Sequence, residues 1–124
     1  MIDEITLTFP REPDFQRVAH LVLGGLAVRL NLTIENLEDL QIALDSLLER
    51  TDHEDGQGDV TVRMSLHDDA LEAVVGPLSS RLLDEIDEEE AGDELRLRRV
   101  LESTVDDVHV EGDSVRLTKR VGGG

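Results

Sequence analysis

Histidine and acidic side chains are the groups of this chain that could hold a metal ion or move protons. The chain has four histidines and 29 aspartates and glutamates, but no cysteine. The histidines show no metal-ligand spacing, and His20 lies in an apolar stretch where a structural imidazole is the usual explanation. The acidic cluster 52–55 could attract a divalent cation, yet it lacks the glycine-spaced ligand order of a calcium loop, which favours a solvated loop. Ser79-Ser80 has no identifiable base and is expected to cap a helix. We therefore predict no metal site.

Length and charge limit the possible functions. At 124 residues the chain is long enough for one domain, expected over residues 1–121, with a flexible tail at 122–124. The net charge of −17 argues against nucleic-acid binding, because that binding depends on neutralising phosphates with basic side chains. It also disfavours anionic membrane surfaces and suits a basic protein partner. Solubility alone, or a salty cytoplasm, would explain the acidity equally well.

The cellular compartment is inferred from targeting and membrane signals. The chain opens with the acidic segment 1–4, which does not fit the basic start of a secretory signal. The most apolar run, 18–28, is about half the length that a transmembrane helix needs. The absence of cysteine does not itself define the compartment. These features together predict a cytoplasmic protein.

Two periodicities in the sequence define the expected secondary structure. Alternating apolar and polar residues predict strands over residues 5–9, 60–66, 71–75, 108–110 and 115–121. Helical spacing predicts helices over residues 14–30, 34–50, 78–86 and 97–105. Tight turns between adjacent strands imply antiparallel pairing, with the helices gathered on one face of the sheet. The expected fold is an α+β two-layer sandwich with a mixed, mainly antiparallel sheet of about five strands.

Local signals add detail to these elements. The first helix is expected to pack closely against a neighbour at Gly24-Gly25, with a chain break there as the alternative. Its expected apolar face consists of Phe15, Val18, Ala19, Val22, Leu26 and Leu30. Thr33 is a suitable N-cap for the second helix, whose expected buried face consists of Leu37, Leu40, Leu44, Leu47 and Leu48. The segment Asp84 to Glu94 contains eight acids in eleven residues. It is expected to form a solvated loop or, alternatively, a docking surface for basic helices.

The segment Asn36 to Arg50 carries the clearest family pattern, which reads NLEDLQIALDSLLER. Its apolar register, and its position after one strand and one helix, resemble the nucleotide-binding helix of the anti-sigma-factor serine kinases of the GHKL ATPase superfamily. The opening segment 7–19 and the closing segment 105–110 are also similar to this family. The resemblance covers nearly the whole chain, from Ile5 to Val121, and implies the same order of elements.

The resemblance also implies a nucleotide site whose functional groups have been replaced. In the family, this helix carries a glutamate that acts as general base and an asparagine that binds magnesium, and the matching positions here are Ser46 and Arg50. Val74 matches an aspartate that binds the adenine amino group, and Gly76 matches the glycine that follows it. Arg96 occupies a position where a glycine lets the backbone approach the phosphates. One alternative stays open, in which Arg50 contacts a phosphate directly.

The function implied by the resemblance is that of a catalytically degenerate anti-sigma regulator that needs no cofactor. Its partner would be a sigma factor or an anti-sigma-antagonist domain, and a homodimer is implied because family members commonly dimerise. Arg17 matches a partner-contacting arginine of the family, although an ordinary surface arginine is the simpler interpretation. The alternative is an active, ATP- and magnesium-dependent serine-protein kinase with divergent motifs. A third possibility is a structural or solubility module without a regulatory partner.

Overall fold

A computed structural model describes residues 4–10, 13–30, 32–52, 58–67, 70–87 and 97–120. Its strands form one sheet in the order β1-β2-β3-β5-β4, and each neighbouring pair is antiparallel. The strands are β1 (Glu4–Pro10), β2 (Asp59–His67), β3 (Ala70–Gly76), β4 (Asp107–Glu111) and β5 (Ser114–Arg120). The predicted strands and their antiparallel pairing are therefore confirmed.

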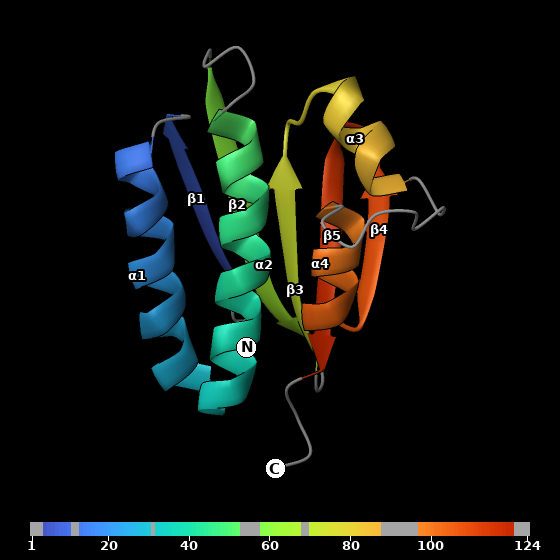
Figure 1. Ribbon diagram of the computed structural model, residues 1–124. Coiled ribbons are helices and arrows are strands. Elements are labelled where there is room, and N and C mark those ends of the chain that lie inside the picture. The colour runs from blue at the N-terminus through green and yellow to red at the C-terminus, as the bar shows by residue number, and fades with distance from the viewer. Residues whose placement is uncertain are drawn as a thin grey trace.

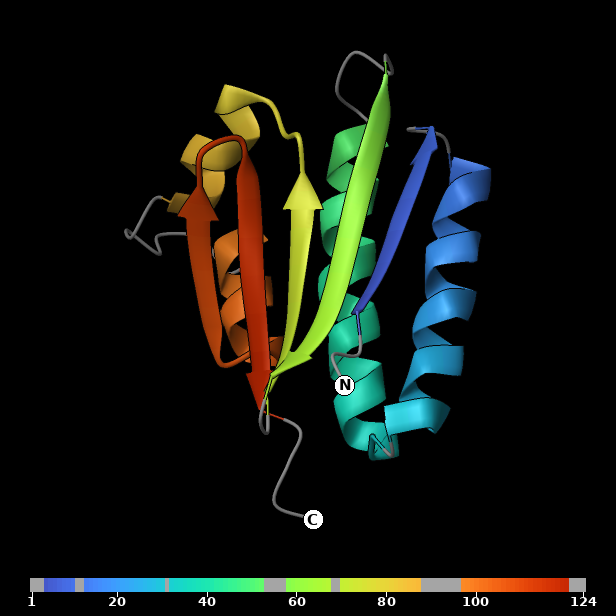
Figure 2. The same ribbon diagram turned by 180° about the vertical axis from the view of Figure 1, so that it is seen from behind.

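Within the described residues, four helices cover one side of this sheet and leave the other side open (Figure 1, Figure 2). They are α1 (Pro13–Leu30), α2 (Ile34–Asp52), α3 (Ser80–Asp87) and α4 (Leu97–Thr104). Within the helical layer, α2 lies between α1 and α4 and contacts both of them. The arrangement confirms the predicted two-layer α+β sandwich. We call the two sides of the sheet its helix-facing side and its open side.

The hydrophobic core lies between the two layers. Successive side chains of a strand point to opposite sides of the sheet. On β3, Leu71, Ala73 and Val75 are buried on the helix-facing side, whereas Glu72 and Val74 are only partly buried. The helical layer contributes buried leucines from α1, α2, α3 and α4 to the same apolar cluster. With only two phenylalanines in the chain, aliphatic side chains supply nearly all of this burial.

Both predicted helix caps are present. The Thr33 hydroxyl accepts a hydrogen bond from the backbone N–H of Asn36 (3.0 Å), so the first turn of α2 has one of its free donors satisfied. The Ser79 hydroxyl accepts a bond from the backbone N–H of Leu82 (3.1 Å) at the start of α3. The α2 helix continues two residues beyond the predicted end and finishes at Asp52.

Two expectations for α1 are wrong. Val18 is exposed, and Leu23, which the predicted apolar face omitted, is fully buried instead. At Gly24 and Gly25, a Cβ atom would meet no heavy atom within 4 Å, so neither glycine is needed for close packing. The acidic segment also differs from expectation, because residues 84–87 belong to α3 and only 88–94 lie outside the described residues.

Among the helices that the structure describes, none is long and apolar enough to cross a membrane.

Candidate functional site

The segment 36–50, which resembles the family's nucleotide-binding helix, lies in α2. Its buried face consists of Leu40, Ala43, Leu44, Leu47 and Leu48, which are all almost inaccessible to solvent. Ser46 lies off this face and is half-buried. A serine hydroxyl carries no charge at neutral pH and is not among the groups that usually act as a general base. Arg50 follows one turn later in α2, and its side chain lies outside the described residues. The helix thus keeps its packing face and has no carboxylate at the expected base position.

An ion pair joins α2 to the sheet on the helix-facing side. Lys119 is the only lysine of the chain, and its Nζ lies 3.0 Å from Oδ2 of Asp39 in α2. The two side chains are 14% and 30% exposed, so the pair is partly desolvated. Because β5 is a central strand and Asp39 lies in the first half of α2, this contact fixes the helix against the sheet.

Replacing Lys119 by methionine is expected to destabilise the fold by about 1–2 kcal/mol, because Asp39 would lose its partner while partly buried. Methionine keeps most of the apolar stem, so the loss reports mainly on the charge. Chemical denaturation of Lys119→Met, Asp39→Asn and the double variant should give a coupling free energy of about 1 kcal/mol. The pair between Arg98 and Glu102 (3.3 Å), in which Glu102 is 56% exposed, is the control, and Glu102→Gln should destabilise the fold by only a few tenths of a kcal/mol. Additive single-variant effects would contradict a direct interaction.

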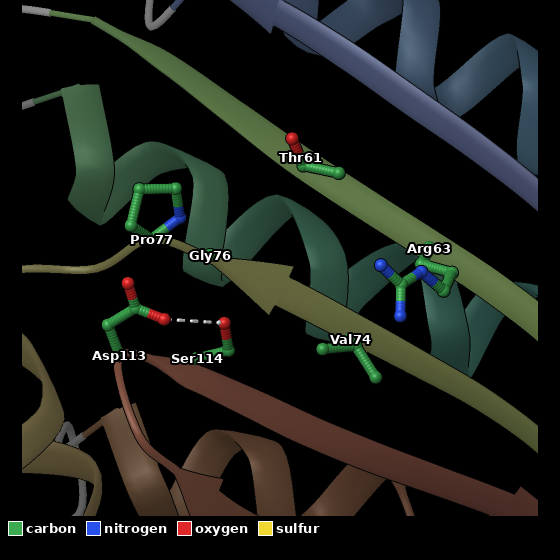
Figure 3. A pocket seen from close by; sticks show the side chains of 7 residues that line it. All are labelled: Thr61, Arg63, Val74, Gly76, Pro77, Asp113 and Ser114. Atoms are coloured by element: carbon green, nitrogen blue, oxygen red, sulfur yellow. Dashed lines mark hydrogen bonds between the residues drawn. The ribbon is translucent and has the colours of Figure 1, made fainter.

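Val74 and Gly76 lie at the carboxyl end of β3, and both line a pocket on the open side of the sheet (Figure 3). The pocket has a volume of about 230 Å³, and Thr61, Arg63 and Ser114 line other parts of it. Ser46, by contrast, belongs to the helical layer on the other side of the sheet. The structure therefore brings Val74 and Gly76 together but does not bring Val74 and Ser46 into one cavity.

Gly76 allows a close approach between β3 and the start of β5. A Cβ atom at this position would lie 2.2 Å from the Ser114 hydroxyl oxygen and 3.1 Å from the carbonyl oxygen of Asp113. The Ser114 hydroxyl donates a hydrogen bond to the Asp113 carboxylate (3.2 Å), which is drawn in Figure 3. Gly76 is therefore explained by contact between protein segments, whatever its role toward a nucleotide.

The other two predicted site residues, Arg17 and Arg96, lie far apart along the chain. Arg17 is on α1 and is exposed, whereas Arg96 lies outside the described residues. Sequence reasoning missed the Lys119–Asp39 pair and the exposed apolar residues Leu21 and Val28 on α1. The sequence did contain a signal for Leu21 and Val28, because both fall outside the apolar face that helical spacing predicts for α1.

Within the described parts of the chain, no group of three or more histidine and acidic side chains is placed to hold a metal ion. In the helical layer, Nδ1 of His20 in α1 lies 3.4 Å from a carboxylate oxygen of Asp45 in α2. This contact links the two helices in the helical layer. Asp45 directly precedes Ser46 along α2.

The chain is similar over nearly its whole length to proteins named serine-protein kinase RsbW. The protein of that name from Listeria monocytogenes serotype 4a is 30% identical in an alignment that covers 98% of this chain and 89% of the relative. The Bacillus subtilis protein is 31% identical over 77 residues, which are 59% of this chain and 48% of the relative. The chain thus spans about half the length of the Bacillus relatives that it matches and most of the length of the Listeria relative. No protein-family model matches the chain.

The fold is also found in a solved structure. The crystal structure of the RsbU and RsbW domains of a Mycobacterium tuberculosis protein matches 96% of this chain, which corresponds to 32% of that longer chain, with a TM-score of 0.71. The sequences are 16% identical, so this match establishes the fold. The Listeria alignment establishes the closer relationship, and it confirms the resemblance that the segment 36–50 indicated. This chain belongs to the family of the serine-protein kinase RsbW.

Proposed function

We propose that this protein is an anti-sigma-factor-like regulator that acts by binding a protein partner, in a bacterial cytoplasm. The partner would be a sigma factor or an anti-sigma-antagonist domain. Membership of the RsbW family supports the regulatory role. One observation favours binding over catalysis: α2 keeps its complete buried face while Ser46 stands where the family's base is expected.

The proposal includes a degenerate nucleotide site that takes up neither ATP nor magnesium. An adenine amino group needs an acceptor at the carboxyl end of β3, and the helix-facing residues of this strand are Leu71, Ala73 and Val75. None of them can accept a hydrogen bond through its side chain, and an unmet polar group in a buried site costs about 1–3 kcal/mol. A shift of the family alignment by one residue, from Val74 to Val75, leads to the same conclusion. The degenerate site therefore does not depend on the choice between these two valines.

Titration with a fluorescent ATP analogue in the presence of magnesium is expected to show no saturable binding up to millimolar nucleotide. The physical reason is the combined loss of the base, the adenine acceptor and the magnesium ligand, each worth about a tenfold or larger change in affinity or rate. The same titration with the magnesium chelated gives the baseline. Micromolar binding that requires magnesium would contradict this part of the proposal.

The alternative function is an active serine-protein kinase with divergent motifs. The name that the relatives carry, serine-protein kinase, is the observation that favours this alternative. The two functions differ in one measurable step, which is transfer of the ATP γ-phosphate to a serine of an antagonist domain. Transfer that depends on the protein and on magnesium would establish the alternative. It would leave the protein-binding role intact, because a kinase must also bind its substrate.

Arg17 and the exposed side of α1 are the proposed partner-binding surface. Arg17 is exposed on α1, four residues before the exposed Leu21, and is therefore free to contact a partner without unfolding the domain. Arg17→Glu is expected to lower the affinity for a captured sigma factor by about tenfold or more, with no change in the denaturation midpoint. Arg99→Glu, which changes the same charge on the exposed side of α4, is the matched control.

Two outcomes would contradict this assignment. Equal loss of affinity in both arginine variants would indicate a general charge effect rather than a contact at α1. Failure to capture any sigma factor or antagonist domain of the same genome in stoichiometric amount would favour a module without a regulatory partner. A homodimer is also part of the proposal, and sedimentation equilibrium of the purified protein tests it.

A further inference from the structure

Large hydrophobic side chains are exposed in one region of this protein. Among the side chains that the structure describes, the large hydrophobics classed as exposed all belong to α1 or α2. They are Val18 (41% exposed), Leu21 (74%), Val28 (81%), Ile34 (74%) and Ile42 (48%). The other helices and the open side of the sheet contribute none to this group within the described ranges. Because α1 and α2 lie side by side, these residues mark one surface of the helical layer (Figure 1).

Helical spacing places the most exposed of these residues on the sides of α1 and α2 that face away from the sheet. Leu21 and Val28 are seven residues apart, so they lie on one face of α1, two turns from each other. Leu23 and Leu26, on the opposite face, are buried in the core. On α2, Ile42 lies opposite the buried leucines at positions 40 and 44. We call the surface formed by Leu21, Val28, Ile34 and Ile42, with the acidic residues around them, the outer face.

On the outer face, α1 presents Leu21 and Val28 together with the exposed cation Arg17, whereas α2 presents Ile34 and Ile42 among acidic residues. Glu35, Glu38 and Glu49 are exposed on α2 and share a helical face with Ile42, since they are seven, four and seven residues away from it. Near Leu21 and Val28, α1 carries two glycines, and a Cβ atom at either position would meet no heavy atom within 4 Å. The surface beside Leu21 is therefore open enough to accept a bulky apolar side chain from outside.

This division of charge identifies the kind of partner. An amphipathic helix with one apolar side and one basic side would place its apolar residues on α1 and its basic residues over the glutamates of α2. A second copy of this chain fits poorly, because it would bring two acidic α2 zones together in a protein whose net charge is −17. The apolar content of the face exceeds what scattered surface residues require, since three of its members, Leu21 and Val28 of α1 and Ile34 of α2, are more than 70% exposed.

We propose that the outer face of α1 and α2 is a docking surface for a basic amphipathic helix of the protein partner. This inference rests on the proposed function, which it extends from Arg17 to a defined surface with a stated partner chemistry. Binding would bury Leu21 and Val28 and pair basic side chains with Glu38 and Glu49. The core would not rearrange, because the residues of the outer face are already outside it.

The test uses a synthetic helical peptide of about five turns with leucine on one side and lysine on the other. One control peptide has the same composition in scrambled order, and a second control peptide has glutamate in place of lysine. Fluorescence anisotropy should show that the amphipathic peptide binds at least about tenfold more tightly than either control. Leu21→Ser should reduce that affinity by about tenfold, and Glu38→Lys should reduce both the affinity and its dependence on salt.

Asp107→Lys is the matched control for charge, because Asp107 is exposed at the edge strand β4, far along the sheet from α1. The variants Leu21→Ser, Glu38→Lys and Asp107→Lys should all keep the wild-type denaturation midpoint. Equal weakening by Asp107→Lys and Glu38→Lys would overturn the proposal, as would unchanged binding in Leu21→Ser. If Leu21→Ser separates a dimer and leaves peptide binding unchanged, the face is a self-interface and the proposal fails. If a sigma factor still binds the Leu21 and Glu38 variants, the proposed docking surface is wrong while the proposed function stands.

Discussion

Val75→Asp should destabilise the domain by about 3 kcal/mol or more, whereas Val74→Asp should cost about 1 kcal/mol or less. The two residues are neighbours on β3 but point to opposite sides of the sheet. Val75 is fully buried in the core, so an aspartate there would have to be dehydrated without a partner. Val74 lies on the open side between Arg63 of β2 and Arg116 of β5, which are its register partners. A carboxylate at position 74 would therefore gain favourable cross-strand neighbours.

Urea denaturation of the two variants measures this difference directly. The comparison has its own control, because both changes introduce the same side chain into the same strand. A stable Val75→Asp variant would indicate that the space between β3 and the helical layer admits a polar group, which would weaken the proposal of a degenerate nucleotide site. A Val74→Asp variant as unstable as Val75→Asp would contradict the assignment of Val74 to the open side.

The alternation of side chains along a strand explains why the sequence alone could not tell which side of the sheet Val74 faces. A shift of one residue in the alignment of a strand moves every side chain to the other side of the sheet. Matching Gly76 to the family's glycine placed Val74 at the aspartate position, and the structure shows that position 74 faces away from α2. Alternation within β3 was visible in the sequence, but which side faces the helices depends on packing between distant segments. The two-layer fold itself was predictable because each strand and helix has a clear period.

Other differences between prediction and structure come from the surface. Helical spacing identified most of the buried face of α2 correctly, because five apolar residues there define a single direction. The face of α1 was less certain, since apolar residues lie all round this helix and spacing cannot tell Val18 from Leu23. Helical spacing alone does not distinguish an exposed apolar residue from a buried one on such a helix. Leu21 and Val28 fall outside the predicted face of α1, but the outer face as a surface shared by α1 and α2 becomes visible only when burial is known for both helices.

Leu47→Ala should lower the free energy of unfolding by about 3 kcal/mol, one of the largest effects expected for a single apolar truncation in this chain. Leu47 is fully buried in α2 and belongs to the cluster that includes Ile86 of α3 and Leu101 of α4. Truncation leaves a cavity in the hydrophobic core, and the rigid surroundings can close it only partly. Ile42→Ala in the same helix removes a residue that is 48% exposed and should cost well under half as much.

These two variants separate the scaffold from the contact surface of α2. If the outer face binds a partner helix, Ile42→Ala should weaken binding of the amphipathic peptide, whereas its loss of stability should stay well under half of that in Leu47→Ala. Leu47→Ala should lower the stability and leave peptide binding unchanged, provided that binding is measured below the reduced denaturation midpoint of this variant. The helix would then serve two independent purposes, because its inner residues hold the sheet and its outer residues meet the partner. Equal destabilisation by both changes would show instead that Ile42 supports the core, and the outer face would lose its central residue on α2.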